Sequence, residues 1–315
     1  MVCCDCLVSF LGNGVLLLII YKILSALYRI FYPYKIAEPK NLHTLAGNAK
    51  WAVVTGASDG IGKAYAKELA KQKYNVLLVS RSQSKLDSAA EEVKREAPGS
   101  TVQTFAFDFK VGTLEEYKPL LNKLEQLEIG VLVNNVGCSF DVPEVMHEFG
   151  MQMLTDITVV NNLPVTLLSA SVLSQMAKRR AGVLINLSSS AGYPELNRWS
   201  VYSSTKRYVL HLTSILQQEY EPQGITVQCL TPWMVSTTMT KNMKPNFFVM
   251  TPDAFVRSAL RAVGLISVTT GCFSHQIQKE ILDVIPQFIK RPAALKASLA
   301  VKKQAEEERK KAKQQ

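Results

Sequence analysis

The sequence predicts an α/β protein in which a doubly wound parallel sheet carries helices on both faces, preceded by an N-terminal membrane helix. Three observations predict this fold class. Short apolar runs alternate with helical patterns through the middle of the chain, a glycine-rich turn follows the first run, and an uncharged apolar stretch lies near the N-terminus. Strands that are apolar throughout and separated by helical segments indicate a parallel sheet with both faces covered.

The expected strands and helices alternate along the chain. The strands are expected at residues 51–55, 76–80, 102–108, 131–134, 183–187 and 225–230. The helices are expected at residues 61–72, 84–97 with Ser84 as the cap, 114–127, 151–178 and 199–220. The crossovers should be right-handed, and one domain of about 240 residues needs no internal boundary.

The first apolar run ends in a glycine-rich turn that contains Gly56, Gly60 and Gly62. A strand, a glycine turn and a helix N-terminus form a pyrophosphate site, because glycines let the backbone approach and free N–H groups face the phosphates. The spacing is Gly-x-x-x-Gly-x-Gly rather than Gly-x-Gly-x-x-Gly, and an ordinary tight turn is the alternative. The flanking strand and helix favour a Rossmann-type dinucleotide site.

Tyr202 and Lys206 are four residues apart and share one face of the helix expected at 199–220. A free phenol titrates near ~10, and an adjacent ammonium favours the phenolate and lowers that pKa. The pair is therefore a candidate general acid for reducing a ketone, or general base for oxidising an alcohol. Tyr-x-x-x-Lys alone is a weak motif, but Ser189 at the end of an apolar run and the glycine turn strengthen it.

Over residues 49–271 the chain resembles the short-chain dehydrogenase/reductase superfamily. The matching motifs are, in order, the glycine turn, Asn-Asn-Val-Gly at 134–137, Asn161, Ser189, and Tyr202 with Lys206. Within the superfamily the chain most resembles the membrane-bound branch of the 17β-hydroxysteroid dehydrogenases of types 3 and 12, which includes very-long-chain 3-oxoacyl-CoA reductases. The N-terminal apolar segment, valine in Asn-Asn-Val-Gly, and Ala-Val-Gly-Leu at 262–265 carry this closer match.

The resemblance implies four catalytic residues. Tyr202 would deliver the proton to the carbonyl oxygen, and Lys206 would lower the pKa of Tyr202 and bind the nicotinamide ribose. Ser189 would donate to the same carbonyl oxygen, and Asn161 would complete a proton relay through water. Only the spacing selects Ser189 from three consecutive serines, and a mid-helix asparagine is by itself more often a solvated or capping residue.

Arg81, at the end of the second strand, indicates the cofactor. An acid at this position binds the ribose 2′-hydroxyl, whereas arginine accommodates a 2′-phosphate. We therefore expect NADP(H), with reduction favoured. Lys63 either adds charge to this site or is a surface residue. The resemblance implies the following cofactor-binding set, in which Asp108 contacts the adenine: Gly56, Ser58, Asp59, Gly60, Ile61, Gly62, Ser80, Arg81, Asp108, Asn135, Tyr202, Lys206, Pro232, Val235 and Thr237.

The formal net charge of +10 is concentrated at the C-terminus. Residues 290–315 carry nine Lys or Arg and three Glu, a net of +6, so the catalytic body is near neutral and a nucleic-acid surface is not expected. This basic tail has an alternating, helical and solvated pattern. By resemblance, Lys311 and Lys313 form a dilysine signal for retrieval to the endoplasmic reticulum.

The cysteines predict neither a disulfide framework nor a metal site. Cys138, Cys229 and Cys272 lie in core-like runs and are expected to be free thiols of a domain that faces the cytosol. A cluster at the N-terminus has no histidine nearby, so metal binding is not expected there. This cluster comprises Cys3, Cys4 and Cys6.

Residues 1–35 are expected to anchor the chain in a membrane. The segment 7–31 carries no charge before Lys22, and 25 helical residues span about 37 Å, which suffices to cross a bilayer. A signal peptide fits poorly because the start is acidic. Arg29 lies near the end of the segment, and Lys35 and Lys40 follow it, which places the catalytic domain (residues 47–289) in the cytosol. A helix lying on the membrane surface is the alternative, and residues 281–301, which mix apolar and basic side chains, are a candidate for additional bilayer contact.

The substrate is expected to be a large apolar ketone. The segment 233–250 normally covers the substrate in this superfamily, and here it carries methionines and aromatics without acids before a helix begins at Thr251-Pro252. Core packing is the alternative interpretation. Lys241 and Lys244 are either contacts for CoA phosphates or solvated charges, so a steroid and a 3-oxoacyl-CoA both remain. A retinoid dehydrogenase and a catalytically silent NADPH- or lipid-binding module are the other functions considered, and the helices at 151–178 and 199–220 suit a homodimer.

Overall fold

The computed structural model describes residues 4–314 and contains a seven-stranded sheet in which every pairing is parallel. The strand order is β3-β2-β1-β4-β5-β6-β7, so the direction of winding reverses between β1 and β4. The strands are β1 (Trp51–Thr55), β2 (Asn75–Ser80), β3 (Val102–Ala106), β4 (Ile129–Asn134), β5 (Gly182–Leu187), β6 (Ile225–Leu230) and β7 (Val268–Thr269). The predicted fold class is confirmed, and β7 is the strand that the sequence pattern missed.

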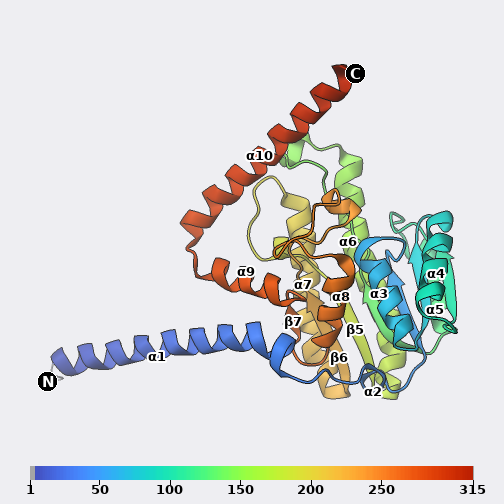
Figure 1. The fold of residues 1–315 in the computed structure, drawn as a ribbon, viewed down its shortest axis with the longest axis horizontal. Coiled ribbons are helices and arrows are strands. Elements are labelled where there is room, and N and C mark those ends of the chain that lie inside the picture. Colours follow the sequence, from blue (N-terminus) through green and yellow to red (C-terminus); the bar gives the residue numbers. More distant parts are fainter. Residues whose placement is uncertain (1–3, 315) are drawn as a thin grey trace.

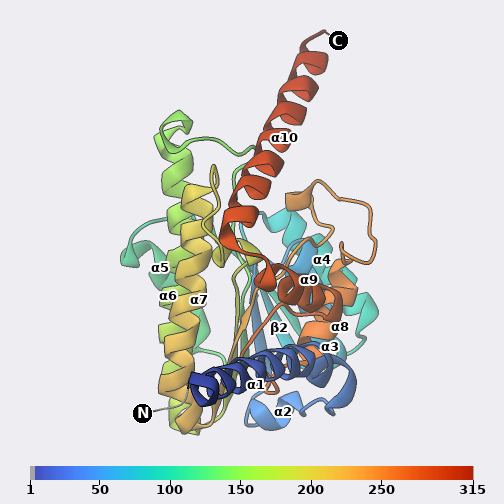
Figure 2. The ribbon, with the colours of Figure 1, turned by 90° about the vertical axis from the view of Figure 1, so that its left-hand side faces the viewer.

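Helices cover both faces of the sheet (Figure 2). One face packs against α3 (Gly60–Lys71), α4 (Gln83–Glu96) and α8 (Pro252–Arg261), and the other against α5 (Leu114–Glu125), α6 (Met151–Arg179) and α7 (Ser200–Tyr220). Successive strand residues enter opposite cores, as Val53 and Val54 do, because side chains alternate across a strand. Both faces are therefore apolar, which explains the continuous apolar runs in the sequence.

Helix ends follow local capping chemistry. Thr113 and Glu116 form a capping box at the start of α5, and the Thr251 hydroxyl accepts from Ala254 N at the start of α8, as predicted. The predicted cap of α4 is wrong: the N-cap is Ser82, because the Ser84 hydroxyl lies inside the first turn, 3.2 Å from that of Ser82. Strand β3 also ends two residues earlier than predicted, at Ala106.

The two ends of the chain form helices outside the sheet layers. Helix α1 (Cys4–Phe31) projects from the body and continues through a π-helical turn (Tyr32–Ile36) to the short helix α2 (Leu42–Leu45) (Figure 1). Helices Ser9–Ile36 and Met151–Arg179 are long and apolar enough to cross a membrane. Half of the most apolar window of the second is buried as part of the core, whereas none of that of the first is.

The C-terminal part contains α9 (Phe273–Val284) and α10 (Gln287–Gln314). The sequence pattern divides the tail from the catalytic domain at 289/290, and this point falls in the first turn of α10. Helix α10 runs past the body, and its C-terminal part projects beyond it (Figures 1 and 2). The Trp199 Nε1 donates to the Ser298 hydroxyl over 3.2 Å, and Lys302 forms an ion pair with Glu144.

Candidate active site

The predicted site residues gather where the carboxyl ends of β1, β4 and β5 meet. This edge lies at the point where the winding of the sheet reverses, and open α/β sheets bind ligands there. The glycine turn follows β1, residues 135–138 follow β4, and Ser189 follows β5. Helix α7 brings Tyr202 and Lys206 to the same edge, and α6 brings Asn161.

The glycine turn leaves no space for side chains. Gly56 and Gly60 have φ of +63° and +53°, and a Cβ on Gly62 would lie 2.2 Å from Gly56 O. The Asn135 amide closes the turn by donating to Thr55 O (2.8 Å) and Gly56 O (3.2 Å). The turn leads into the N-terminus of α3, where the Asp59 side chain makes no capping hydrogen bond. The turn therefore fits a dinucleotide, because backbone N–H groups at the start of α3 remain to bind its phosphates.

Asp59, predicted to bind the cofactor, accepts a hydrogen bond from the Thr238 hydroxyl. This bond ties the glycine turn to the segment after β6. Thr237 lies on the same segment, and its Cγ2 is 3.0 Å from the Cβ position of Gly60. Pro232 O accepts from Ser190 N (3.0 Å), and Val235 is buried. These predicted residues are therefore brought beside the glycine turn and Ser189.

The other end of the predicted dinucleotide site lies at the end of β2. The Ser58 hydroxyl is 2.9 Å from that of Ser80, which links the glycine turn to this strand. Arg81 and Asp108 are exposed, and Asp108 accepts from Lys110 N. An exposed guanidinium at the end of β2 fits a ribose 2′-phosphate. Lys63, in contrast, is paired with Glu92 on α4 (3.0 Å).

Lys206 is buried beside the ring of Tyr202. Its side chain donates to Leu187 O (3.2 Å), and its Nζ lies 5.9 Å from the centroid of the Tyr202 ring. A Cβ on Gly137 would lie 3.1 Å from both the Lys206 Nζ and the Asn161 Oδ1. The glycine of the Asn-Asn-Val-Gly motif therefore provides the space in which these two polar groups approach each other.

Asn161 is buried and fully hydrogen-bonded. Its amide donates to Thr205 Oγ1 (2.9 Å) and Cys138 O (3.0 Å), and its Oδ1 accepts from Cys138 N (2.8 Å). These bonds exclude the alternative of a solvated or capping asparagine. Asn161 fixes the backbone of residue 138 next to Lys206.

Contacts distinguish the three consecutive serines. The Ser188 hydroxyl is buried and donates to Lys206 O (2.6 Å), so it supports the backbone of α7. The Ser189 hydroxyl accepts from Ala191 N (3.1 Å) and lowers the pKa of the neighbouring Tyr202 phenol by hydrogen bonding. Ser189 is therefore the serine that the fold places beside Tyr202, as the spacing predicted.

Burial sets the pKa of both members of the Tyr202 and Lys206 pair. Desolvation raises the pKa of Tyr202, although the hydrogen bond with Ser189 opposes this shift. Desolvation also lowers the pKa of Lys206 to about 8. The net shift of the Tyr202 pKa is upward because burial outweighs the hydrogen bond with Ser189, and the expected lowering of this pKa by Lys206 stays a prediction. Tyr202 stays protonated at neutral pH, which suits a proton donor.

Sequence patterns missed three residues of the site. The buried Thr55 hydroxyl accepts from Asn135 N (2.9 Å) and Val136 N (3.0 Å), which holds the end of β4 to β1. Thr205 binds Asn161 and donates to Tyr202 O (2.8 Å). The buried His275 accepts from Trp233 N (3.3 Å), and burial lowers the pKa of this imidazole to about 4. Thr205 lies inside the Tyr-x-x-x-Lys motif, but none of the three has a sequence signal of its own.

The segment after β6, which is expected to cover the substrate, carries exposed apolar side chains. In the segment after β6 these side chains have 40–57% of their surface exposed, and they are Met234, Met239, Met243, Phe247 and Phe248. The alternative that this segment is core packing is therefore excluded for these residues. A pocket of about 360 Å³ lies between residues 141–153 and α10, with Phe149, Met153, Lys302 and Arg309 among its lining residues.

The thiols take no part in a metal site within the described chain. Among residues 9–311, whose side chains the structure describes, no group of three or more His, Cys, Asp or Glu is placed to hold a metal ion, and the N-terminal cysteine cluster lies outside this range. Cys229 and Cys272 are buried free thiols, while Cys138 is half-buried and burial raises its pKa to about 11. Cys3 lies outside the described residues.

Comparisons with known proteins identify the family. A family model described as short chain dehydrogenase matches residues 50–246. A very-long-chain 3-oxoacyl-CoA reductase of Caenorhabditis elegans is 49% identical over 289 residues, which is 91% of each chain. The protein named putative steroid dehydrogenase 2 of the same organism is 44% identical over 88% of this chain and 89% of its own.

More distant relatives agree with this assignment. A very-long-chain 3-oxoacyl-CoA reductase of Macaca fascicularis is 39% identical over 81% of this chain and 82% of its own. Among solved structures, a short-chain dehydrogenase from Sphingobium yanoikuyae in complex with NADPH is 25% identical, with a TM-score of 0.63 over 76% of this chain and 97% of its own. The chain belongs to the short-chain dehydrogenase family of oxidoreductases.

Proposed function

We propose that the protein is an NADP(H)-dependent ketone reductase of lipid metabolism whose substrate is a very-long-chain 3-oxoacyl-CoA. The observation that carries the proposal is the position of the Tyr202 phenol, which lies beside the Ser189 hydroxyl and the buried Lys206 at the edge that holds the glycine turn. A proton donor, a hydrogen-bond donor and a buried cation in this arrangement suit carbonyl reduction.

In this mechanism NADPH, when bound, supplies the hydride to the carbonyl carbon. The Tyr202 phenol, kept protonated by burial, donates its proton to the carbonyl oxygen. The Ser189 hydroxyl donates a hydrogen bond to the same oxygen and stabilises the negative charge that develops there. Lys206 binds the ribose and, with Asn161, returns a proton to Tyr202 through water. Support for this relay comes from the buried Lys206 beside the Tyr202 ring and from Asn161, which fixes the backbone of residue 138 next to Lys206.

The cofactor is NADP(H). The residues that would hold it are those of the glycine turn, Asn135, Ser80 and Arg81, with Thr237 at the nicotinamide end. Support comes from the exposed guanidinium of Arg81 at the end of β2, where an acid would select NAD(H), and from relatives of known structure that contain NADPH or NADP.

The apolar segment after β6 supports a long hydrophobic substrate. Exposed methionines and phenylalanines form a deformable apolar surface. Lys241 and Lys244 are exposed on the same segment and suit the phosphates of CoA. A ketosteroid is the second candidate, because relatives that are 40–45% identical are named putative steroid dehydrogenases. A catalytically silent module is disfavoured, since Asn161, Ser189, Tyr202 and Lys206 are all present and grouped.

We place the enzyme in the endoplasmic reticulum membrane, with α1 crossing the bilayer and the catalytic domain in the cytosol. The exposed apolar surface of α1 supports the anchoring, and the basic residues after it support the orientation. A homodimer through the outer surfaces of α6 and α7 is supported by exposed apolar side chains such as Ile215.

Substrate competition tests the proposed activity. Full-length protein in nanodiscs with NADPH is offered a very-long-chain 3-oxoacyl-CoA, a 17-ketosteroid, retinal and a small polar ketone, and NADPH absorbance is followed. We expect the highest kcat/KM for the 3-oxoacyl-CoA, and the Tyr202→Phe protein supplies the background rate. Turnover of retinal alone, or of the polar ketone alone, contradicts a lipid-ketone reductase, and a preference for the ketosteroid selects the second candidate.

Protease protection tests the proposed location. In sealed microsomes the protein should resist alkaline extraction, and a C-terminal tag should be open to added protease. Protection of that tag in intact vesicles contradicts the cytosolic orientation.

A further inference from the structure

The corner between α9 and α10 (residues 281–291) exposes a group of large apolar side chains. Ile281, Val284, Phe288 and Ile289 have 57%, 81%, 76% and 50% of their surface exposed. Single exposed apolar residues are common on soluble proteins, but four within nine residues form a patch that marks an interaction site.

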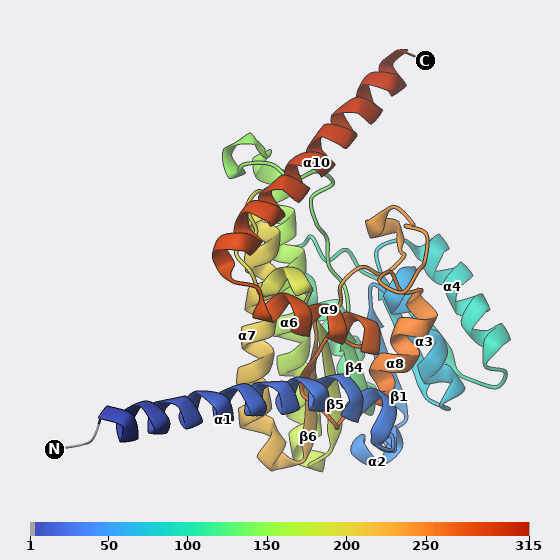
Figure 3. The same cartoon turned by 60° about the vertical axis from the view of Figure 1, so that its left-hand side comes forward.

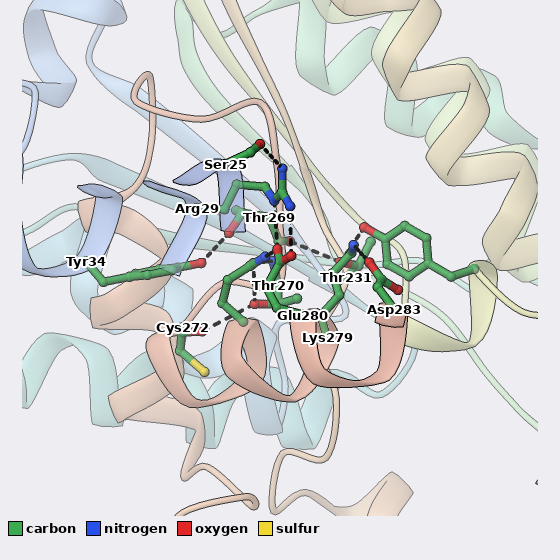
Figure 4. A network of polar contacts seen from close by, with 12 residues as sticks. Ser25, Arg29, Tyr34, Thr231, Thr269, Thr270, Cys272, Lys279, Glu280 and Asp283 are labelled. Carbon is green, nitrogen blue, oxygen red and sulfur yellow. Dashed lines mark hydrogen bonds and ion pairs between the residues drawn. The ribbon is translucent and has the colours of Figure 1, made fainter. Parts of the chain in front are cut away.

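The corner is fixed to the base of the N-terminal helix. The Arg29 guanidinium donates to both carboxylate oxygens of Glu280 on α9, at 2.7 Å each (Figure 4). The rings of Phe31 and Phe273 pack edge to face at 5.4 Å, and Tyr34 bonds to the Thr269 hydroxyl. A bidentate ion pair and an aromatic contact hold α9 in one orientation relative to α1.

The corner lies near the level of Lys22 on α1. Helix α9 runs antiparallel to the end of α1, since Phe273 contacts Phe31 while Glu280 contacts Arg29. The Arg29 guanidinium also donates to Ser25, so it points towards the N-terminus of α1. Val284 is one further helical turn along α9. Figures 1 and 3 show the corner at a level partway along the length of α1, separated from that helix.

Lys22 marks the point where α1 would leave the hydrocarbon core of a bilayer. Residues 4–21 carry no Lys or Arg and span about 27 Å as a helix, close to the ~30 Å of a hydrocarbon core. The corner at this level combines apolar side chains with Lys290 and, one turn and a half later, Lys296. Apolar side chains that enter the acyl boundary beside lysines at the headgroups are typical of interfacial membrane contacts.

We propose that the α9–α10 corner is a second membrane contact, which rests in the headgroup region of a bilayer that contains anionic lipids. The proposal rests on the proposed anchoring of α1, because the corner lies at the level along α1 where that helix would leave the bilayer. A second copy of the chain is a poorer occupant, because a two-fold contact would bring the same lysines together. Membrane contact through both α1 and the corner would fix the tilt of the catalytic domain relative to the bilayer. Helix α10 then runs from the bilayer to Trp199, which contacts the Tyr202 ring.

Tryptophan reporters in the full-length protein test the proposal. Phe288→Trp is placed in nanodiscs of phosphatidylcholine and phosphatidylserine, and its emission is measured above the native background. We expect quenching by lipids brominated near the headgroup and protection from iodide. Leu114→Trp is the matched control, because Leu114 is an exposed apolar residue (59%) on α5, on the opposite side of the molecule (Figure 1). It should be quenched by iodide and not by brominated lipid.

A third reporter separates this proposal from the anchoring of α1. Leu17→Trp should be quenched by lipids brominated deep in the acyl chain. If Leu17→Trp is quenched while Phe288→Trp behaves like Leu114→Trp, the corner does not contact the membrane and the anchor stands. Protection of Phe288→Trp from iodide without lipid quenching indicates a protein partner and also overturns the proposal. If Leu17→Trp is not quenched, the proposed anchoring fails, and the corner proposal fails with it.

Discussion

The two sides of the active site differ in structure. The cofactor side consists of the glycine turn and the strand ends, and the proposed substrate side consists of the segment after β6 and α10. On the cofactor side, polypeptide backbone packs against backbone, and Thr55 and Asn135 hold the strand ends together through hydrogen bonds. On the proposed substrate side, the segment after β6 exposes apolar side chains, and α10 is held to the loop before α6 by the ion pair between Lys302 and Glu144. The glycine turn has no space for an added methyl group at Gly62, whereas the apolar side chains of the second side are 40–57% exposed. Substitutions should therefore cost more on the first side than on the second.

The largest expected effect falls on the residue between the two sides. Tyr202→Phe should lower kcat by about a hundred- to ten-thousand-fold, the usual contribution of a general acid, because the phenol proton is lost. NADPH affinity should stay within a few-fold, since the glycine turn is untouched. Single-turnover NADPH oxidation and NADPH titration measure the two quantities. Activity within tenfold of the unmodified protein contradicts the assignment, and Ser204→Ala, at an exposed neighbour on α7, is the control.

A methyl group in the glycine turn should disable the cofactor side alone. Gly62→Ala places a Cβ 2.2 Å from Gly56 O, so the turn must move away from its phosphate-binding geometry. We expect NADPH affinity to fall by roughly a hundredfold or more, the effect of a displacement of about 1 Å in a positioned site. Gly112→Ala is the matched control, because nothing lies within 4 Å of its Cβ position. Normal NADPH affinity in folded Gly62→Ala protein would show that the glycine turn does not bind the cofactor phosphates.

Cofactor choice should depend on one exposed cation. Arg81→Gln should weaken NADPH relative to NADH by roughly ten- to hundredfold, since a hydrogen bond to a charged group contributes about 1.5–3 kcal/mol. Arg95→Gln, an exposed arginine on α4, should change neither affinity. Preference of the unmodified protein for NADH over NADPH would exclude the assignment of Arg81.

The pH dependence should report the buried lysine. Burial lowers the pKa of Lys206 to about 8, so its ammonium is present below that pH and is lost above it. The rate of ketone reduction should therefore fall above pH 8, by about tenfold per unit once the lysine is the limiting group. Lys206→Arg, which stays protonated, should have a lower rate but no such fall. A profile that is flat to pH 10 in the unmodified protein contradicts this role.

The smallest effect is expected on the substrate side. Lys302→Met breaks the ion pair with Glu144 beside the 360 Å³ pocket and should raise KM for the lipid substrate about two- to fivefold, as expected for a partly exposed pair. NADPH affinity should not change. Lys303→Met, one residue along α10 and 80% exposed, is the control. Equal effects of both substitutions would mean that α10 does not contact the substrate side.

Local sequence patterns predicted which helices and strands form more accurately than they predicted the residues at which these elements begin and end. The strands were recognisable because burial on both faces requires apolar residues throughout, which is a property of each run by itself. The start of α4 was placed at Ser84 instead of Ser82 because both hydroxyls suit a cap, and only the backbone path selects one. The two-residue strand β7 is too short for any pattern, and it forms only because Cys229 and Leu230 offer an edge to pair with.

The sequence by itself determined the fold class, the family and the residue types of the candidate site, because glycine turns, Tyr-x-x-x-Lys and Asn-Asn-Val-Gly are local patterns with local chemistry. Only the tertiary structure decided the proton affinities of Tyr202 and Lys206, since desolvation depends on every element packed around them. It also decided that Asn161 is held by Cys138 and Thr205, and that α9 and α10 expose an apolar corner. These properties arise from contacts between residues far apart in the chain, which no run of neighbouring residues encodes.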